Sequence, residues 1–233
     1  MSGFTNKPKI LRGAFVEYGL SLPPLFVVFQ FNPVQLTRNR SLSYDPPNSG
    51  AKALPNVSAR TLRDFHQSST SLTQLRREQV VTVSEETIGF ELRLDASDRL
   101  NEGDAIAEQF GIAPQLSTLE LMVHPKGESL IDEALGSFLG SSDGFSFTRK
   151  SNPPLVLFIW GRKRVLPVNI NSLNITEVLY SADLNPIRAT ASVNLTVIEG
   201  QNSPYLYSRA MKEAMSVLNL ANLTEIANVV IPG

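Results

Sequence analysis

Few residues in this chain of 233 are of the types that carry out covalent or metal chemistry. The chain has no cysteine and only two histidines, His66 and His124, which lie far apart in the sequence. The lack of cysteine excludes disulfides, thiolate metal sites, iron–sulfur clusters and cysteine nucleophiles. Two histidines are too few for a multi-histidine metal site. No acidic residue lies within three positions of His124, so we interpret both histidines as exposed or hydrogen-bonded side chains.

The densest group of acidic residues contains Asp95, Asp98, Glu102 and Asp104. It lacks the ligand spacing of a calcium loop and its terminal glutamate. We interpret these carboxylates as solvating a turn and preceding a helix, where they meet the positive end of the helix dipole. The sequence also lacks the glycine-rich phosphate loops and the nucleophile elbow of hydrolases. It therefore predicts no catalytic residues, no metal and no cofactor, although spacing alone does not exclude a pair of catalytic carboxylates.

Basic residues form three short clusters, at Arg60 and Arg63, at Arg76 and Arg77, and at 162–164. Such clusters either bind phosphate or solvate turns and form ion pairs, and we favour the second interpretation. The formal net charge is -1, and no aromatic residues alternate with these clusters as base stacking would require. The sequence therefore predicts no nucleic-acid partner.

The elements that would position these residues are mostly strands. Alternating or continuous apolar residues predict strands within 8–20, 25–31, 79–95, 155–160, 166–170, 173–180 and 188–197. The pattern at 25–31 is typical of a strand buried on both faces at its start. The clearest alternation lies at 188–197, where Ala189 to Val197 supply the apolar positions and Arg188 to Thr196 the polar ones. A change of apolar parity between Ile175 and Val178 indicates a β-bulge.

Helices are expected at 103–111, at 115–123 and at 203–222. In the last, Ser203 would be the N-cap, Pro204 suits the first turn, and the apolar residues recur at helical spacing. The segments 38–76 and 124–151 are rich in small and polar residues and are expected to be loop insertions. The whole chain is predicted to be a single α+β domain, 1–233, built mainly on antiparallel sheet.

Several short motifs occur in a characteristic order. Phe29-Gln30-Phe31-Asn32-Pro33 with Leu36 opens the series, and the second half contains the runs at 155–161, 164–168, 172–177, 185–189 and 195–197. This set resembles the tube-like domain of contractile injection systems and contractile phage tails. The resemblance covers about 30 residues at both ends of the domain, and the order of the motifs is more specific than any one of them.

The resemblance implies a tube-like β-sandwich or barrel with a flanking helix, assembled as a ring of six copies around a channel. The nearest subgroup is the tube-initiator or inner-baseplate type, here expected without its LysM module. The implied function is a structural ring at the base of the inner tube, which joins the spike hub to the tube and nucleates tube assembly. The implied partners are further copies, the spike or hub protein, the inner tube protein and other baseplate proteins.

Candidate subunit contacts follow from the matching motifs, from the aromatic strand end and from the long loop. They are Phe31, Asn32, Pro33, Arg60, Arg63, Trp160, Gly161, Asn185, Pro186 and Arg188. Each has an alternative role within the fold, namely turn geometry for the prolines and core packing for the aromatic residues.

Two other functions stay open from sequence, besides an ordinary inner tube subunit. One is a carbohydrate-binding or cell-wall-binding β-sandwich, which would display exposed aromatic residues and act as a monomer. The other is a hydrolase with acidic catalysts. The longest apolar run, 155–160, is far shorter than the roughly 20 residues of a membrane helix, and the first residues do not resemble a secretory signal. We therefore expect cytoplasmic assembly followed by incorporation into a phage tail-like particle, with no direct membrane insertion.

Overall fold

The computed structural model describes residues 11–19, 24–47, 61–125 and 152–221. The chain divides into two compact units, of which the first comprises residues 1–37 and 87–233 and the second comprises residues 38–86.

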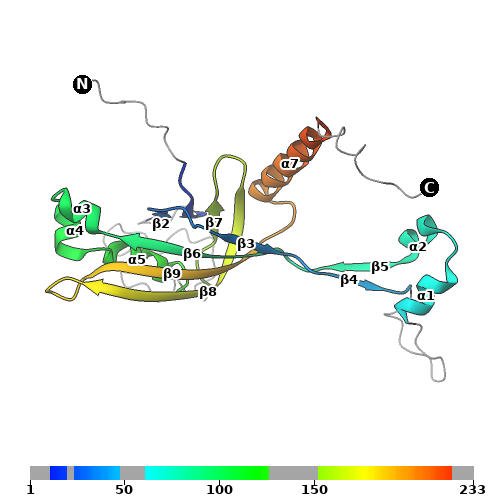
Figure 1. Ribbon diagram of the computed structural model, residues 1–233, viewed down its shortest axis with the longest axis horizontal. Coiled ribbons are helices and arrows are strands. Elements are labelled where there is room, and N and C mark those ends of the chain that lie inside the picture. The colour runs from blue at the N-terminus through cyan, green and yellow to red at the C-terminus, as the bar shows by residue number, and fades with distance from the viewer. Residues whose placement is uncertain (1–10, 20–23, 48–60, 126–151, 222–233) are drawn as a thin grey trace, which may run out of the picture. The chain divides into compact units, whose positions relative to one another are not determined.

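The first unit is built on a seven-stranded sheet with the strand order β2-β1-β7-β8-β9-β6-β3 (Figure 1). Its strands are β1 (Ala14–Glu17), β2 (Phe26–Val28), β3 (Leu36–Asn39), β6 (Thr87–Asp95), β7 (Val156–Ile159), β8 (Val165–Tyr180) and β9 (Pro186–Val197). The last two residues of β3, 38 and 39, already belong to the second unit. The pairs from β2 through to β6 are antiparallel. The predicted α+β class with a mainly antiparallel sheet is therefore confirmed. The sheet has β2 and β3 at its edges, so the described residues form no closed barrel.

The predicted alternation along β6 and β9 is confirmed by their pairing. Ile88 lies opposite Leu195 and Phe90 opposite Val193, and all four side chains are buried. The polar residues between them point to the opposite face, because successive residues of a strand alternate between the two faces of a sheet.

Aromatic packing dominates the core beneath this sheet. Phe15, Phe29, Phe90 and Phe158 are buried, and their ring centroids lie 5.2–6.4 Å apart. The four come from β1, from the residue after β2, from β6 and from β7, so one aromatic cluster ties together segments that lie far apart in the sequence. Aromatic pairs at such separations contribute beyond their buried area.

Two strands differ from their predicted form. The strand expected within 25–31 is the three-residue edge strand β2, and Phe26 is 60% exposed. Burial of this strand on both faces was therefore a wrong prediction, because Val27 points into the core whereas Phe26 and Val28 point to the opposite face, which is exposed. The two strands expected between 166 and 180 form one long strand, β8. Its register shifts around Glu177 and Leu179, which confirms the predicted irregularity.

Three short helices follow β6 in the chain. They are α3 (Ser97–Asn101), α4 (Ala105–Phe110) and α5 (Ala113–Leu121), and the last two lie within one or two residues of the predicted helices. Asp104 caps α4 by accepting a hydrogen bond from the amide of Ala107, as its position before a helix indicated. Leu116 and Leu119 of α5 are buried in the same core as the phenylalanines.

The C-terminal helix α7 (Ser203–Leu218) begins one residue earlier than its predicted cap implied. Asn202 is the N-cap and accepts a hydrogen bond from the amide of Tyr205, so Ser203 and Pro204 already lie in the first turn. Ser208 is the buried residue of this helix, whereas the apolar stripe is exposed or half-buried.

The second unit contains regular structure where the composition predicted a loop. Strands β4 (Leu42–Asp45) and β5 (Val80–Val83) pair antiparallel, and helices α1 (Leu62–Ser68) and α2 (Leu72–Glu78) lie between them in the sequence. The helices are capped by Thr61 and Ser71, whose hydroxyls accept backbone hydrogen bonds. The cap residues of such short helices are the residues that make a sequence resemble a loop, which explains the wrong prediction. Most of the other expected insertion, 124–151, lies outside the described residues.

Candidate functional site

One face of the sheet carries the core, and the central part of the other is polar and uncharged. On β9 this polar face contains Thr190, Ser192, Asn194 and Thr196. They lie opposite Thr176, Asn174, Ser172 and Asn169 of β8, respectively. The side-chain amide of Asn194 donates to the hydroxyl of Ser172 at 3.0 Å, and the side-chain amide of Asn171 donates to the hydroxyl of Thr196 at 2.5 Å. A protein surface normally carries a mixture of long charged side chains. A hydrogen-bonded surface of short neutral side chains is typical of a wet interface or a water-filled channel.

Charged residues appear on the same face at β6, where Glu91 lies opposite Ser192 and Arg93 opposite Thr190 of β9. At the end of β6, Asp95 lies opposite Arg188. The guanidinium of Arg188 donates to Asp95 at 2.7 Å. Partial burial raises the pKa of Asp95, but hydrogen bonds from Ser97 and Arg188 together outweigh it and lower the pKa below the ordinary value of 3.8. Arg188, a predicted subunit contact, therefore has a partner within its own chain. The pair is half-exposed, and such pairs contribute about 0.2–1 kcal/mol.

The N-terminal group of predicted contacts is divided between internal and surface roles. The side chain of Asn32 accepts a hydrogen bond from the amide of Gly13 and donates one to the carbonyl of Leu11, both at 2.9 Å. It therefore holds two chain segments together. Phe31 is exposed, and Pro33 is half-buried in the turn that follows. In this group Phe31 is the residue that remains available for a partner.

The second group of predicted contacts mainly shapes turns. The ring of Trp160 stacks on Phe158 with centroids 6.0 Å apart, and Gly161 has a φ of 66° in the turn between β7 and β8. The side-chain amide of Asn185 donates to the carbonyl of Gln109 at 2.9 Å, and the carbonyl of Pro186 accepts a hydrogen bond from the backbone amide of Ile112 at 2.8 Å. These contacts support the alternative role within the fold for Trp160, Asn185 and Pro186.

The predicted contacts in the long insertion fall in the second unit. Arg63 is exposed on α1, and Arg60 lies outside the described residues. The described structure therefore leaves Arg63 available for a partner, as it does Phe31.

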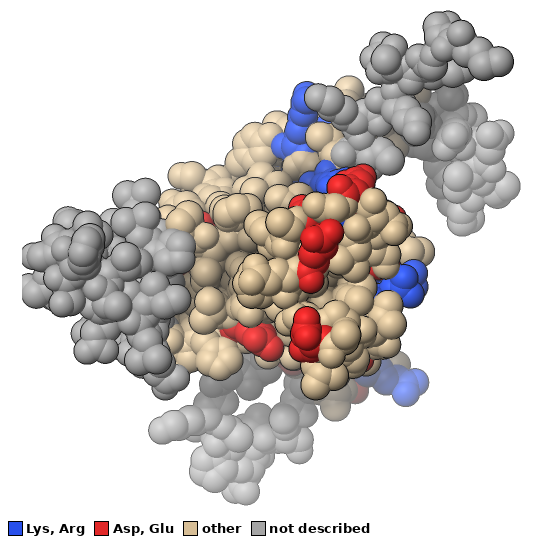
Figure 2. Space-filling model, turned by 90° about the vertical axis from the view of Figure 1, so that its left-hand side faces the viewer, with Lys and Arg blue, Asp and Glu red and all other residues tan. Residues whose placement is uncertain are grey.

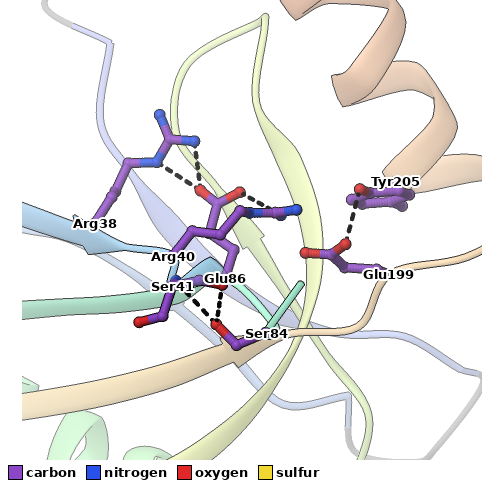
Figure 3. A network of polar contacts seen from close by, with 7 residues as sticks. All are labelled: Arg38, Arg40, Ser41, Ser84, Glu86, Glu199 and Tyr205. Atoms are coloured by element: carbon purple, nitrogen blue, oxygen red, sulfur yellow. Dashed lines mark hydrogen bonds and ion pairs between the residues drawn. The ribbon is translucent and has the colours of Figure 1, made fainter. Parts of the chain in front are cut away.

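An ion cluster that the sequence analysis did not single out lies in the second unit (Figure 3). Glu86 is only 3% exposed, and its carboxylate accepts hydrogen bonds from Arg38 at 2.6 Å and from Arg40 at 3.4 Å. Beside it, the hydroxyl of Ser84 donates to the carbonyl of Ser41 at 2.9 Å. The sequence signal was the alternation of Arg38 and Arg40, which places both guanidiniums on one side of an extended chain. The cluster fixes the two chain segments that lead into and out of the β4–β5 ribbon.

The end of the first unit that carries α3, α4 and α5 is acidic. Residues 95–125 contain six carboxylates and one arginine. Figure 2 shows acidic side chains spread over this end, with the basic ones at its margins. Asp98, Glu102 and Glu108 are exposed, whereas Asp104 serves as the cap of α4. The acidic residues that were expected to precede a helix thus also place several separate carboxylates on the surface of this end.

Helix α7 is attached to the sheet through a polar contact. The hydroxyl of Ser208 donates to the carbonyl of Val165 at 2.6 Å and accepts from the amide of the same residue at 2.8 Å. Two further contacts accompany it, from the Tyr207 hydroxyl to the carbonyl of Arg162 and from the Tyr205 hydroxyl to Glu199 (Figure 3).

We expect Ser208→Ala to lower the free energy of unfolding by about 1–2 kcal/mol, because the half-buried backbone amide of Val165 would lose its partner. Urea unfolding of purified protein measures this loss, and hydrogen exchange along α7 would rise with it. Ser216→Ala, on the exposed end of the same helix, is the matched control and should change stability by less than about 0.5 kcal/mol. Equal stability of the two variants would contradict the attachment.

Two other kinds of site are absent from the part of the chain that the structure describes. Among the described residues, no three histidine, aspartate or glutamate side chains are grouped closely enough to hold a metal ion. No helix in the described part of the chain combines the length and apolar character needed to cross a membrane. No protein-family model and no curated protein matches the sequence.

Proposed function

We propose that this chain is a non-enzymatic ring component of a contractile injection system, placed at the base of the inner tube between the spike hub and the tube. Its role is geometric, because the ring would present a surface on which tube subunits nucleate and would enclose the channel. The observation that carries the proposal is the sheet, whose face is polar and neutral on β8 and β9 and whose edge strands, among the described residues, are β2 and β3. Copies related by a rotation that divides a full turn would cover such edges and close a ring.

The second unit supports a junction role within this proposal. A ring subunit built on the polar sheet alone would not need the ribbon and two helices of the second unit. Most of the described side chains of this unit are exposed. A component that meets the hub, the tube and its own copies needs additional contact surface of this kind. An ordinary inner tube subunit remains the alternative structural role and would need less of it.

The direct test is electron microscopy of particles from source cells with and without the gene for this chain. We expect sheathed particles that contain the chain in the first case, and hubs without attached tubes in the second. Complete tubes in cells that lack the chain would contradict the proposal. Measured hydrolysis of a cell-wall polysaccharide by the purified protein would contradict its non-enzymatic part.

Removal of the second unit gives a sharper prediction. Replacing Leu42–Val83 by Asn-Gly would join Ser41 to Ser84, whose backbones are already hydrogen-bonded at 2.9 Å, through a two-residue turn. We expect this shortened variant to fold, because the core contacts of the first unit are retained, but we do not expect it to support tube assembly. Thermal unfolding checks the fold, and micrographs of complemented cells check assembly. Normal tubes with the shortened variant would contradict the junction role.

A further inference from the structure

The β4–β5 ribbon has one apolar face that is exposed. Leu42 lies opposite Val83 and Tyr44 opposite Val81, so these four side chains share a face, and each is 43–52% exposed. The other face carries Ser43 and Thr82 among its residues. A two-stranded ribbon is at best marginally stable alone in water, and an apolar face of this kind is usually covered by another element. We refer to these four side chains as the ribbon face.

A second apolar patch lies on the acidic end of the first unit. Ile106 and Phe110, one turn apart on α4, are exposed, and Leu184 in the β8–β9 turn is 79% exposed with a φ of 60°. The hydrogen bond from Asn185 to the carbonyl of Gln109 holds this turn beside α4. A large apolar side chain held outward in a backbone region that costs about 1 kcal/mol or more is unusual at a turn. We refer to Ile106, Phe110 and Leu184 as the α4 patch.

Exposed arginines accompany the ribbon face and exposed carboxylates accompany the α4 patch, although the described residues of the second unit contain five acidic side chains as well as five arginines. Asp98, Glu102 and Glu108 lie on the helices around the α4 patch, and all three are exposed. The helices that accompany the ribbon face carry Arg63 on α1 and Arg76 and Arg77 on α2, which are also exposed. Complementary charges around two apolar surfaces steer association and fix its register.

We propose that the ribbon face of one copy docks on the α4 patch of a second copy of this chain, with the arginines of α1 and α2 over the carboxylates around the patch. The two surfaces are different, so the contact is head-to-tail, and repetition around an axis gives a ring. This inference rests on the proposed function and adds which surfaces of neighbouring copies meet.

The absence of cysteine permits a clean cross-linking test on the full chain. Tyr44→Cys and Phe110→Cys are made as separate proteins, mixed, and treated with a bis-maleimide. We expect a covalent dimer containing one chain of each variant, and much less product from either variant alone. Phe26→Cys, on the exposed edge strand β2, is the matched control and should not be joined to Tyr44→Cys. Efficient linkage of Tyr44→Cys to itself, or linkage within a single Tyr44→Cys/Phe110→Cys chain, would overturn the head-to-tail contact.

Charge reversal gives an independent readout. The α2 variant Arg76→Glu/Arg77→Glu and the patch variant Glu102→Lys/Glu108→Lys should each weaken self-association by about ten-fold, because like charges would then face each other. An equimolar mixture should regain the association of the native chain, since each reversed surface then meets an opposite one. Sedimentation velocity at low and high salt measures these changes. Native association by both variants would overturn the proposal.

Failure of this contact is distinguishable from failure of the proposed function. A native chain that remains monomeric at all accessible concentrations, and yields no mixed cross-link, overturns the contact, while micrographs of particles test the ring role separately. If particles contain the ring but the α2 variant Arg76→Glu/Arg77→Glu assembles normally, the contact is wrong and the function stands. If purified copies form the mixed cross-link but cells without the chain still build tubes, the function is wrong and the contact stands.

Discussion

Gly111→Ala is expected to destabilise the protein by about 3 kcal/mol or more, with a melting temperature lower by roughly 10 °C. Gly111 ends α4 with a φ of 58° and a ψ of -125°, a region that glycine occupies at little cost and other residues rarely adopt. A Cβ at this position would also overlap the carbonyl oxygen of Pro186. That oxygen accepts the hydrogen bond from Ile112, so it has no free direction in which to move.

The matched control is Gly103→Ala. Gly103 also has a positive φ, of 71°, but a Cβ there would have no atom within 4 Å. The control should therefore lose only the conformational term, about 1 kcal/mol. Thermal and urea unfolding of the two variants separate backbone strain from overlap. A Gly111→Ala variant no less stable than Gly103→Ala would show that α4 and the β8–β9 turn can separate without cost. The same separation would dismantle the α4 patch.

Glu86→Gln should lower the free energy of unfolding by about 2 kcal/mol. Breaking a buried ion pair costs about 3–5 kcal/mol, but the guanidiniums of Arg38 and Arg40 are one-third exposed and would regain hydration, which reduces the loss. Glutamine retains the shape and one acceptor oxygen, so the variant tests the charge rather than the packing. Because Glu86 fixes the root of the ribbon, we also expect faster tryptic cleavage at Arg76 and Arg77 in α2.

Glu85→Gln provides the control for that measurement. Glu85 neighbours Glu86 in the sequence and is exposed, so the same chemical change should alter stability by less than about 0.5 kcal/mol. Urea unfolding followed by circular dichroism gives the free energies, and a protease time course gives the local effect. Unchanged stability together with unchanged cleavage in Glu86→Gln would show that the buried carboxylate does not hold the ribbon root.

Strands with strict alternation were predictable from the sequence. The register of β9 follows from the small and branched apolar residues at every second position from Ala189, because a shift by one residue would expose all of them. The hairpin of β7 and β8 was predictable for a similar reason, since a buried run is followed by a turn containing Gly161. These features depend on neighbours within a few residues, and their signal is therefore local.

The second unit was not predictable, because its signals oppose each other. The run of serine, threonine and asparagine indicated a loop, yet two of these residues cap α1 and α2. Likewise, the stripe of α7 has the spacing of a buried helix face but is exposed, since its single buried attachment is the hydroxyl of Ser208. Spacing shows that a face exists, whereas only the folded chain shows whether anything covers it.

The sequence by itself determined the chemistry that this protein lacks and the faces of its regular strands. Composition excluded thiolate and multi-histidine sites, and the period of two along β6 and β9 assigned each side chain to the core or to the polar face. Only the tertiary structure decided that Glu86 is enclosed by Arg38 and Arg40 and that Gly111 lies against Pro186. The physical reason is that these contacts join residues 46 to 75 positions apart, and neither composition nor periodicity specifies which distant segments meet.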